Sequence, residues 1–529
     1  MPAAIPLSSV TTIPKLVARA AAFFGERSAI EEGAVQLSFA ELAVACLEST
    51  RAFLAAGMNP GDRVAIWSPN SYEWILAAIG LQSAGAVLVP INTRFKAAEA
   101  GYLLSKSGAR LLFTTGEFLG VSYADSLGEH RPSSLERIIT FRGDSLAGEP
   151  WTRFLAAASA VAPATALARI DAVQADDYAD IMFTSGTTGK PKGVISTHRQ
   201  NLRVFEAWSE VVGLRAGDRY LIVNPFFHAF GYKAGWLASI MRGATMLPHQ
   251  VFDAEVVVGR IEKEKITVFP GPPALFQSIL ALPRLADYDL SSLRLAVTGA
   301  AVIPVTLVER MRDELGFESV VTGYGLTECS GAVSMCRHDD DPVTIATTSG
   351  RAIPDVEVRC VDADGREVPR GEAGEIVVRG YNVMVGYFED EAATKETIDE
   401  QGWLHTGDVG TMDEAGYLRI TDRIKDMYIM GGFNCYPAEI ENLLFTLAGV
   451  AQVAVIGVPD ERMGEVGMAF IVPKPGAALT PESIIAWSRA QMANYKVPRF
   501  VRLVDALPMN ATGKVTKFAL REQAARELG

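Results

Sequence analysis

The chain has 529 residues, of which 49% are hydrophobic and 21% are charged. This mix is ordinary for globular proteins and excludes a disordered or collagen-like chain. At about 150 residues per domain, the length fits three or four domain-sized units, or one large body with a small appended domain. Asp and Glu number 62 against 49 Lys and Arg, which gives a net charge of −13. This balance argues against nucleic acid as the main partner, because a phosphate backbone selects basic surfaces.

The five cysteines do not suggest a disulfide framework, because they are odd in number, scattered and contain no C-x-x-C pair. A reduced, intracellular setting is therefore predicted. The first residues lack a basic segment followed by an apolar run, so no targeting segment is expected. The most membrane-like stretch, 74–91, contains Gln82, Ser83 and Pro90, which is typical of a buried helix leading into a strand. We therefore expect a cytoplasmic protein without a transmembrane segment.

The first half of the chain alternates short apolar runs with helix-like segments. Runs that begin at Arg63, Ala86 and Ala109 are 23 residues apart, which fits a repeat of strand, crossover helix and strand. After a polar stretch at 116–175, further strands are predicted at 181–184, 220–224, 266–269, 295–298 and 319–322. Most of these runs are followed closely by Gly, Pro, Ser or Thr. Loops are therefore expected at the strand ends, where open α/β sheets bind their ligands.

The pattern changes twice in the second half. From about 350 to 420, alternating apolar and polar residues between Gly-rich turns predict a small antiparallel β unit. After about 424, helices are predicted at 438–447, 481–493 and 516–528, and strands at 453–458 and 468–472. The expected fold class is α/β: stacked mixed or parallel sheets with helices and the small β unit, then a small mobile α+β domain. The expected domains are 1–423, with subregions near 1–170, 171–345 and 346–423, and 424–529.

The segment 184–193, Thr-Ser-Gly-Thr-Thr-Gly-Lys-Pro-Lys-Gly, directly follows a predicted strand. Its glycines let backbone N–H groups close on an anion, its hydroxyls add donors, and Lys190 and Lys192 supply positive charge. This composition is typical of a polyphosphate-binding loop, although it does not fit a Walker A loop. The alternative is a flexible linker with scattered charges, which the continuous ten-residue pattern disfavours.

The same segment resembles the phosphate loop of the adenylate-forming (AMP-binding) superfamily, which includes acyl- and aryl-CoA synthetases, luciferases and peptide-synthetase adenylation domains. Other segments match this family in the same order across nearly the whole chain: 224–231, 298–301, 324–328, 405–408, 422–426, 431–434 and 508–514. Any one of them alone would be weak. Seven in the same order are highly specific, and they indicate the acyl-CoA synthetase branch.

The resemblance implies two half-reactions in one site. A carboxylate attacks the α-phosphate of Mg·ATP to give an acyl-adenylate and pyrophosphate, and the thiol of coenzyme A then attacks the acyl carbon and releases AMP. The first step brings an anion against polyanionic ATP, so positive charge and Mg²⁺ must offset the repulsion. The implied protein is an AMP-forming acid–thiol ligase. Its implied partners are ATP, coenzyme A and a small carboxylic acid, and a homo-oligomer stays open.

The resemblance also assigns nucleotide-binding roles. The residues expected at the phosphates are Thr184, Ser185, Gly186, Thr187, Thr188, Gly189 and Lys192. Those expected around the adenine are Gly299, Ala300, Ala301, Tyr324 and Gly325. Glu328 matches the family's Mg²⁺ ligand, a hard carboxylate for a hard cation, and Thr327 would donate to the α-phosphate. Asp408 would accept hydrogen bonds from the ribose hydroxyls, with Arg423 as a second partner.

Lys514 matches the family's lysine that bridges the acyl carboxylate and the α-phosphate. Because Lys514 lies far in sequence from the phosphate segment, the resemblance implies alternation between two domain orientations, with Lys425 as the pivot. Gly431 and Gly432 would border the pantetheine tunnel, where only glycine allows so close a backbone approach. Two further residues stand where relatives contact coenzyme A, namely Met463 and Tyr495, with core packing as the alternative for the methionine.

His228 follows two phenylalanines and precedes another, an environment in which a histidine is usually a core residue. In the resembled family this position borders the acyl pocket and orients the carboxylate or gates the thiol. Peptide-synthetase relatives carry an Asp near this place and this chain does not, which favours a simple carboxylic acid.

The expected pocket wall is Phe227, His228, Phe230, Tyr232, Lys233, Trp236, Pro272 and Cys329. Its bulk disfavours a long straight acyl chain, and Lys233 is expected to reach solvent or to meet a polar group of the substrate.

The segments 226–235, 270–273 and 335–337 resemble a narrower group, the bacterial steroid-degradation ligases that activate the propanoate side chain of a methyl-indanedione fragment (HIP). A cyclic or steroid-derived propanoate is thus the favoured acid, and a medium-chain fatty acid or an aryl acid is the alternative. A non-CoA acceptor and a nucleotide-binding pseudoenzyme are rival interpretations. The pseudoenzyme is disfavoured because the charged site residues are present. The expected catalytic residues are His228, Thr327, Glu328 and Lys514.

Overall fold

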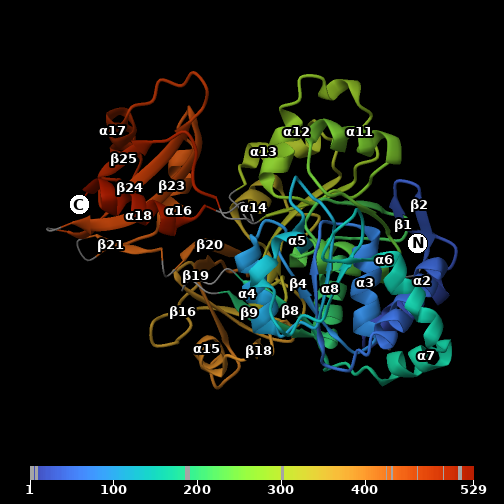
Figure 1. The fold of residues 1–529 in the computed structure, drawn as a ribbon. Helices are drawn as coiled ribbons and strands as arrows, with labels where there is room; N and C mark the ends of the chain where they lie inside the picture. The colour runs from blue at the N-terminus through green and yellow to red at the C-terminus, as the bar shows by residue number, and fades with distance from the viewer. Residues whose placement is uncertain are drawn as a thin grey trace. The chain divides into compact units, whose positions relative to one another are not determined.

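The computed structural model describes residues 5, 10–184, 191–299, 303–423, 426–430, 433–460, 463–492, 494–509 and 515–528 (Figure 1). The chain divides into two compact units. The first unit comprises Met1–Gly299, Ile303–Glu357 and Arg379–Gly402. The second unit comprises Ala300–Val302, Val358–Val378 and Trp403–Gly529.

The largest sheet lies in the first unit and has eight strands. In spatial order they are β18 (Gly386–Tyr387), β9 (Lys192–Thr197), β8 (Tyr178–Thr184), β4 (Val87–Pro90), β3 (Arg63–Trp67), β5 (Leu111–Thr114), β6 (Arg137–Thr140) and β7 (Glu149–Pro150). The strands from β8 to β7 run parallel, and β9 and β18 add antiparallel pairs at one edge. The strands predicted to begin near 63, 86, 109 and 181 are confirmed. β6 and β7 lie in the polar stretch 116–175, where the sequence predicts no strand.

The helices next to this sheet pack on one another through apolar faces. They are α1 (Ile13–Phe24), α2 (Phe39–Ala55), α3 (Tyr72–Ser83) and α7 (Pro163–Ala172). α3 contacts β3 and β4 and is buried from Glu73 to Ser83, which confirms the predicted buried helix leading into a strand. α2 begins with a capping box, in which Ser38 and Glu41 each accept a hydrogen bond from the other's backbone N–H.

Two four-stranded sheets complete the framework of the first unit. One contains β10 (Arg219–Ile222), β11 (Thr245–Pro248), β1 (Ser28–Glu32) and β2 (Val35–Ser38); the other contains β12 (Leu295–Gly299), β13 (Ser319–Tyr324), β14 (Ser334–Met335) and β15 (Arg351–Ala352). Val268 bridges Tyr220 and Leu295 and so joins them. The predicted strand at 266–269 is therefore irregular: its only bridges among the described residues are at Val268, although the N–H groups of Thr267 and Phe269 also donate to the carbonyls of Arg219 and Leu295. α11 (Ala254–Glu264), α12 (Pro273–Leu280) and α13 (Val305–Asp313) pack over this region (Figure 1).

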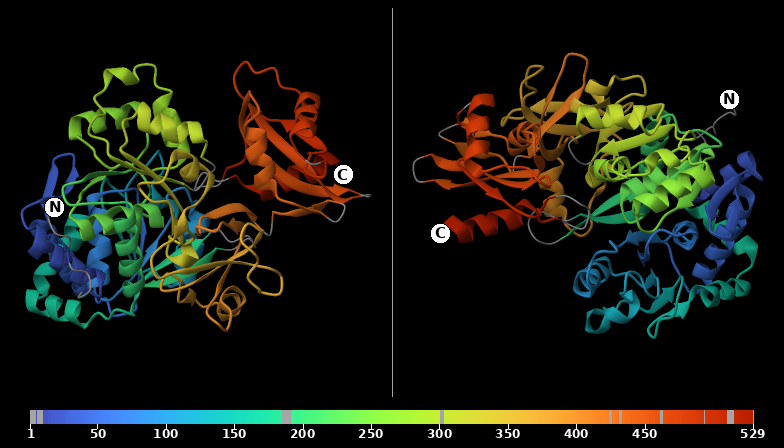
Figure 2. Two further views of the ribbon diagram at one scale, coloured as in Figure 1. Left: turned by 180° about the vertical axis from the view of Figure 1, so that it is seen from behind. Right: turned by 90° about the horizontal axis from the view of Figure 1, so that it is seen from above.

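The second unit contains two sheets. β16 (Glu357–Val361), β17 (Gly374–Arg379), β19 (Leu404–Met412) and β20 (Leu418–Arg423) form the predicted small β unit, with antiparallel pairing from β17 to β20. A five-stranded sheet contains β22 (Phe433–Cys435), β21 (Tyr428–Met430), β24 (Gly464–Pro473), β23 (Val450–Asp460) and β25 (Phe500–Leu503). α16 (Pro437–Phe445) and α18 (Lys517–Leu528) pack on β23, and α17 (Pro481–Gln491) packs on β25 (Figure 2). The predicted α+β character of this segment is confirmed.

The remaining α-helices are α4 (Ala97–Ser107), α5 (Tyr123–Ser126), α6 (Trp151–Ala156), α8 (His198–Val211), α9 (Ala229–Gly231), α10 (Ala238–Arg242), α14 (Pro342–Thr347) and α15 (Glu391–Thr397). Within the described ranges, no single helix has the length and apolar character needed to cross a membrane. One pair passes that test by length and composition alone, 151–160 followed by 163–172, and its members are bent by 98° at the break.

Candidate active site

The predicted phosphate segment is bracketed by an antiparallel pair of strands. β8 ends at Thr184 and β9 begins at Lys192, and these two residues are register partners. The Thr184 Oγ1 donates to the Lys192 carbonyl at 3.4 Å. The remaining predicted phosphate ligands lie outside the described residues: Ser185, Gly186, Thr187, Thr188 and Gly189. Their roles stay predictions.

A tyrosine that the sequence analysis missed connects two predicted site residues. Tyr387 donates a hydrogen bond to Glu328 Oε1 at 3.0 Å, and the Lys192 Nζ lies 4.8 Å from the centre of the Tyr387 ring. Burial, followed by the charge of Glu328, raises the pKa of Tyr387, so its hydroxyl remains a donor at neutral pH. No sequence spacing indicates this cluster, because Tyr387 reaches it only through the pairing of β18 with β9.

The predicted adenine segment lies at the carboxyl ends of two parallel strands. β12 ends at Gly299 and β13 ends at Tyr324, with Gly299 opposite Gly323 in the register. At Gly325 a Cβ atom would stand 2.1 Å from the Gly331 carbonyl oxygen, so this position requires glycine. The turn after it forms a 3-10 helix, Thr327–Cys329, which carries Glu328. Ala300 and Ala301 lie outside the described residues.

In the second unit, the two predicted ribose-binding residues occupy neighbouring strands. Asp408 on β19 is the register partner of Arg423 on β20. Asp408 is 4% exposed, and its backbone N–H donates to Thr406 Oγ1 at 3.1 Å. The structure therefore brings these two backbone positions together. Four other predicted residues of this unit lie outside the described residues, namely Lys425, Gly431, Gly432 and Lys514.

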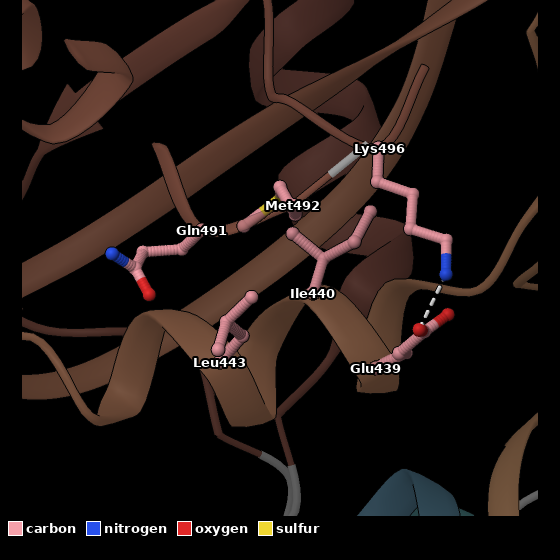
Figure 3. A pocket seen from close by; sticks show the side chains of 6 residues that line it. All are labelled: Glu439, Ile440, Leu443, Gln491, Met492 and Lys496. Atoms are coloured by element: carbon pink, nitrogen blue, oxygen red, sulfur yellow. Dashed lines mark hydrogen bonds and ion pairs between the residues drawn. The ribbon is translucent and has the colours of Figure 1, made fainter. Parts of the chain in front are cut away.

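The two predicted coenzyme A contacts that fall within the described residues pack against the core of the second unit. Met463 and Tyr495 are both partly buried there. The Tyr495 carbonyl accepts a hydrogen bond from Cys435 Sγ at 3.2 Å. A pocket of about 210 Å³ adjoins this segment and is lined by Glu439, Ile440, Leu443, Gln491, Met492 and Lys496 (Figure 3). Lys496, the neighbour of Tyr495, spans the pocket edge to an ion pair with Glu439 (Figure 3).

Four of the predicted acyl-pocket residues have solvent-accessible surface. Phe227, Phe230 and Pro272 are half-buried, and His228 is exposed. The His228 Nδ1 accepts a hydrogen bond from the Phe230 N–H at 3.2 Å, which caps α9. His228 is thus at the surface of the first unit rather than enclosed in an aromatic core.

The other four predicted wall residues, Tyr232, Lys233, Trp236 and Cys329, are buried. The rings of Tyr232 and Trp236 stack at 4.7 Å within a π-helix, Tyr232–Leu237. Lys233 does not reach solvent, because its side chain is 1% exposed, so that part of the expectation is wrong; a contact with a polar group of the substrate stays a prediction. The cause is a buried carboxylate, since Asp180 Oδ1 lies 3.1 Å from Lys233 Nζ and supplies the opposite charge. Burial lowers the pKa of Lys233, and Asp180 partly offsets this.

A second group missed from the sequence is a buried asparagine, Asn70, just beyond the carboxyl end of β3. Its Nδ2 donates to the carbonyls of Ile222 and Asn224 at 3.1 and 2.9 Å. Its Oδ1 accepts from the Phe226 N–H at 2.8 Å. Asn70 therefore fixes the turn that leads to His228. Its place at a strand end, in Ser68-Pro69-Asn70-Ser71, is the sequence signal that points to it.

Comparison with known proteins gives a consistent assignment. A family model described as AMP-binding enzyme matches residues 17–388, and one described as AMP-binding enzyme C-terminal domain matches 439–514. The chain is 51% identical to the 3-[(3aS,4S,7aS)-7a-methyl-1,5-dioxo-octahydro-1H-inden-4-yl]propanoyl:CoA ligase of Rhodococcus jostii, over 97% of this chain and 99% of that protein. It is 48% identical to the ligase of the same name from Mycobacterium tuberculosis, over 98% and 99%.

Solved structures agree with this assignment over the full length. ATP-bound MatB from Rhodopseudomonas palustris matches with a TM-score of 0.86 at 29% identity, over 97% of this chain and 99% of that one. The Mycobacterium tuberculosis fatty acyl CoA synthetase matches with a TM-score of 0.74 at 31% identity, over 98% and 99%. ATP, coenzyme A and a carboxylic acid are therefore the substrates. The chain belongs to the AMP-binding enzyme family, in its acyl-CoA ligase branch.

Proposed function

We propose that this acyl-CoA ligase activates the propanoate side chain of a bicyclic, steroid-derived diketone. The observation that carries the proposal is the identity of 51% and 48%, over nearly the whole chain, to two ligases named for that acid. Phe227 and Phe230, which flank His228 in the sequence, are half-buried rings that suit a compact cyclic acid better than a long chain.

A panel of acids tests this proposal. We expect kcat/KM for the methyl-indanedione propanoate to exceed that for octanoate and for ferulate by about tenfold or more, because a shaped apolar pocket discriminates by packing. The measurement is steady-state formation of AMP with coenzyme A present. An equal or higher kcat/KM for the medium-chain or aryl acid would refute the assignment of the acid and leave the ligase activity intact.

The nucleotide-binding roles are proposed for the residues named from the sequence. Lys192, Thr184 and the segment 185–189 would bind the β- and γ-phosphates. Gly299 to Ala301, Tyr324 and Gly325 would enclose the adenine, and Thr327 would donate to the α-phosphate. Asp408, with Arg423, would bind the ribose hydroxyls through charge-assisted hydrogen bonds.

We infer that Glu328 binds Mg²⁺ together with the phosphates of ATP. Mg²⁺ is usually held by one or two carboxylates plus substrate phosphates, and the single carboxylate of Glu328 fits that pattern. Tyr387 engages only Oε1 in the contacts described, which orients the carboxylate. When bound, Mg²⁺ would offset phosphate charge as the substrate carboxylate approaches.

The second half-reaction is proposed to follow a change in domain orientation, with 1–423 and 424–529 as the two domains. Lys514 would serve the first step. Gly431, Gly432, Met463 and Tyr495 would then contact coenzyme A. We place the whole reaction in the cytoplasm, where both cosubstrates occur.

Lys425→Pro tests the pivot. Proline fixes φ, so we expect the conversion of acyl-adenylate to thioester to slow by about tenfold or more, while ATP–pyrophosphate exchange changes little. Rapid-quench measurement of each half-reaction separates the two. Lys425→Ala is the control, since it removes the side chain and leaves φ free. Unchanged thioester synthesis in the proline variant would show that Lys425 is not the pivot.

A further inference from the structure

His228 lies in the segment 224–237, which ends in the π-helix. Asn70 holds the start of this segment. The Asn70 amide contacts backbone groups of Asn224 and Phe226, and Asn224 Nδ2 donates in turn to the Pro270 carbonyl at 3.1 Å. The segment also folds tightly on itself, because a Cβ atom at Gly231 would lie 2.2 Å from the Pro225 carbonyl oxygen. Its first half therefore has little freedom.

The end of the same segment is held by a buried polar cluster below the π-helix. Lys233 Nζ lies 3.1 Å from Asp180 Oδ1 on β8 and 3.1 Å from Ser196 Oγ on β9. Asp180 Oδ2 accepts from Asn201 Nδ2 on α8 at 2.6 Å. The side chains of Lys233 and Asp180 are 1% and 0% exposed, so water does not compete for these contacts. One ammonium group thus connects the π-helix to two strands and, through Asp180, to α8.

A second set of hydrogen bonds, made by Gln82, also connects the π-helix to β8. Gln82 on α3 donates through Nε2 to the Tyr232 hydroxyl at 2.9 Å and to the Ala179 carbonyl at 3.0 Å. Ala179 precedes Asp180 on β8. The π-helix is therefore tied to the same short stretch of β8 at two successive residues, Tyr232 and Lys233.

β8 is also the strand that leads to the phosphate segment. Asp180 and Thr184 are four residues apart on this strand and lie on the same side of it, because side chains alternate between faces. Thr184 pairs with Lys192 on β9, the strand that also carries Ser196. The Lys233 cluster therefore joins the strands that flank the phosphate segment to the helix that continues from His228.

We propose that Lys233 is a positioning residue, which through Asp180 and Ser196 sets the placement of His228 and the neighbouring acyl-pocket rings relative to the β8–β9 strand pair. An apolar pair could replace a buried ion pair with little loss of stability, but it would lack the directional contacts that fix one arrangement. The inference rests on the proposed role of His228 at the acyl pocket and does not depend on which acid is bound.

The double variant Asp180→Asn with Lys233→Met tests this role, because it removes both charges and leaves no unpaired ion in the core. We expect a folded protein with a cooperative melt and a KM for ATP within about twofold of the parent. The KM for the acid should rise about tenfold or more, with a smaller change in kcat, when the best acid of the panel is used. An acid KM within twofold of the parent, or equal losses for ATP and acid, would overturn the proposal.

A matched control is available at another buried ion pair of the same unit. Arg294 and Asp218 pair at 2.5 Å with 12% and 4% exposure, just before the amino ends of β12 and β10. Arg294→Met with Asp218→Asn should lower the melting temperature and leave the acid KM unchanged. If the acid KM rose as much in this control as in the Lys233 variant, the effect would come from a general loss of rigidity in the unit. That result would refute a positioning role for Lys233.

A milder variant keeps the test valid if the double variant does not fold. Ser196→Ala removes one acceptor of Lys233 and retains the ion pair. We expect the acid kcat/KM to fall about threefold or more while the KM for ATP is unchanged. Parent-like acid kinetics in a folded Ser196→Ala protein would contradict the proposal. An inactive parent enzyme would instead indicate failure of the proposed function.

Discussion

Replacing Lys514 with alanine is expected to abolish formation of the acyl-adenylate while sparing the second half-reaction. The substrate carboxylate and the α-phosphate are both anionic, so the first step needs a cation placed between them. Loss of one such charge-assisted contact should cost about 3–4 kcal/mol in the transition state, or more than about a hundredfold in rate. The second step attacks a neutral acyl carbon and has no such requirement.

Two assays separate the half-reactions of Lys514→Ala. Exchange of labelled pyrophosphate into ATP reports the first step, and conversion of supplied acyl-adenylate with coenzyme A reports the second. Lys474→Ala is the control, because Lys474 is an exposed lysine of the same unit and has no proposed role. If both assays lost the same fraction of activity, Lys514 could not be a residue that acts only in the domain orientation of the first half-reaction.

Much of the framework could be predicted because each strand has a local signature. The runs at Arg63–Trp67 and Leu295–Gly299 are apolar and buried, so composition alone identifies them. β7 was missed because it has only two residues, and β6, although as long as β4, was missed because it lies within a polar stretch. The run 266–269 has strand composition and hydrogen-bonds to β10 and β12, yet its bridges form only at Val268, because the regularity of pairing depends on partners distant in sequence.

The residues of the candidate site show the same difference between local sequence signals and contacts that form only in the fold. Residues in contiguous motifs, such as Glu328 and Lys192, could be named from the sequence because the motif itself carries the chemistry. Tyr387 could not, because its hydroxyl meets Glu328 only after β18 pairs with β9. The prediction that Lys233 reaches solvent was wrong for a related reason: a lysine in an apolar run predicts exposure unless the fold supplies a buried partner such as Asp180.

Glu328→Gln is expected to lower adenylation by about a hundredfold, the size of effect seen when one charge-stabilising group is removed from an active site. Glutamine keeps the length of the side chain and an oxygen that can accept the Tyr387 hydrogen bond, and it loses only the negative charge. We therefore expect a higher Mg²⁺ concentration for half-maximal pyrophosphate exchange. Weaker binding of Mn²⁺ in the presence of ATP, measured by electron paramagnetic resonance, gives a readout independent of turnover.

Two further variants separate charge from orientation at this residue. Tyr387→Phe removes the hydroxyl that holds Glu328 Oε1 and keeps the ring beneath Lys192, so its Mg²⁺ requirement should rise by only about threefold to tenfold, the value of one lost hydrogen bond. Glu389→Gln is the control, since that side chain is 64% exposed and pairs only weakly with Lys106 at 3.4 Å. If Glu328→Gln bound Mn²⁺·ATP as tightly as the parent, the metal ligand would have to be another group. If Tyr387→Phe proved as damaging as Glu328→Gln, orientation of the carboxylate, rather than its charge, would dominate the first half-reaction.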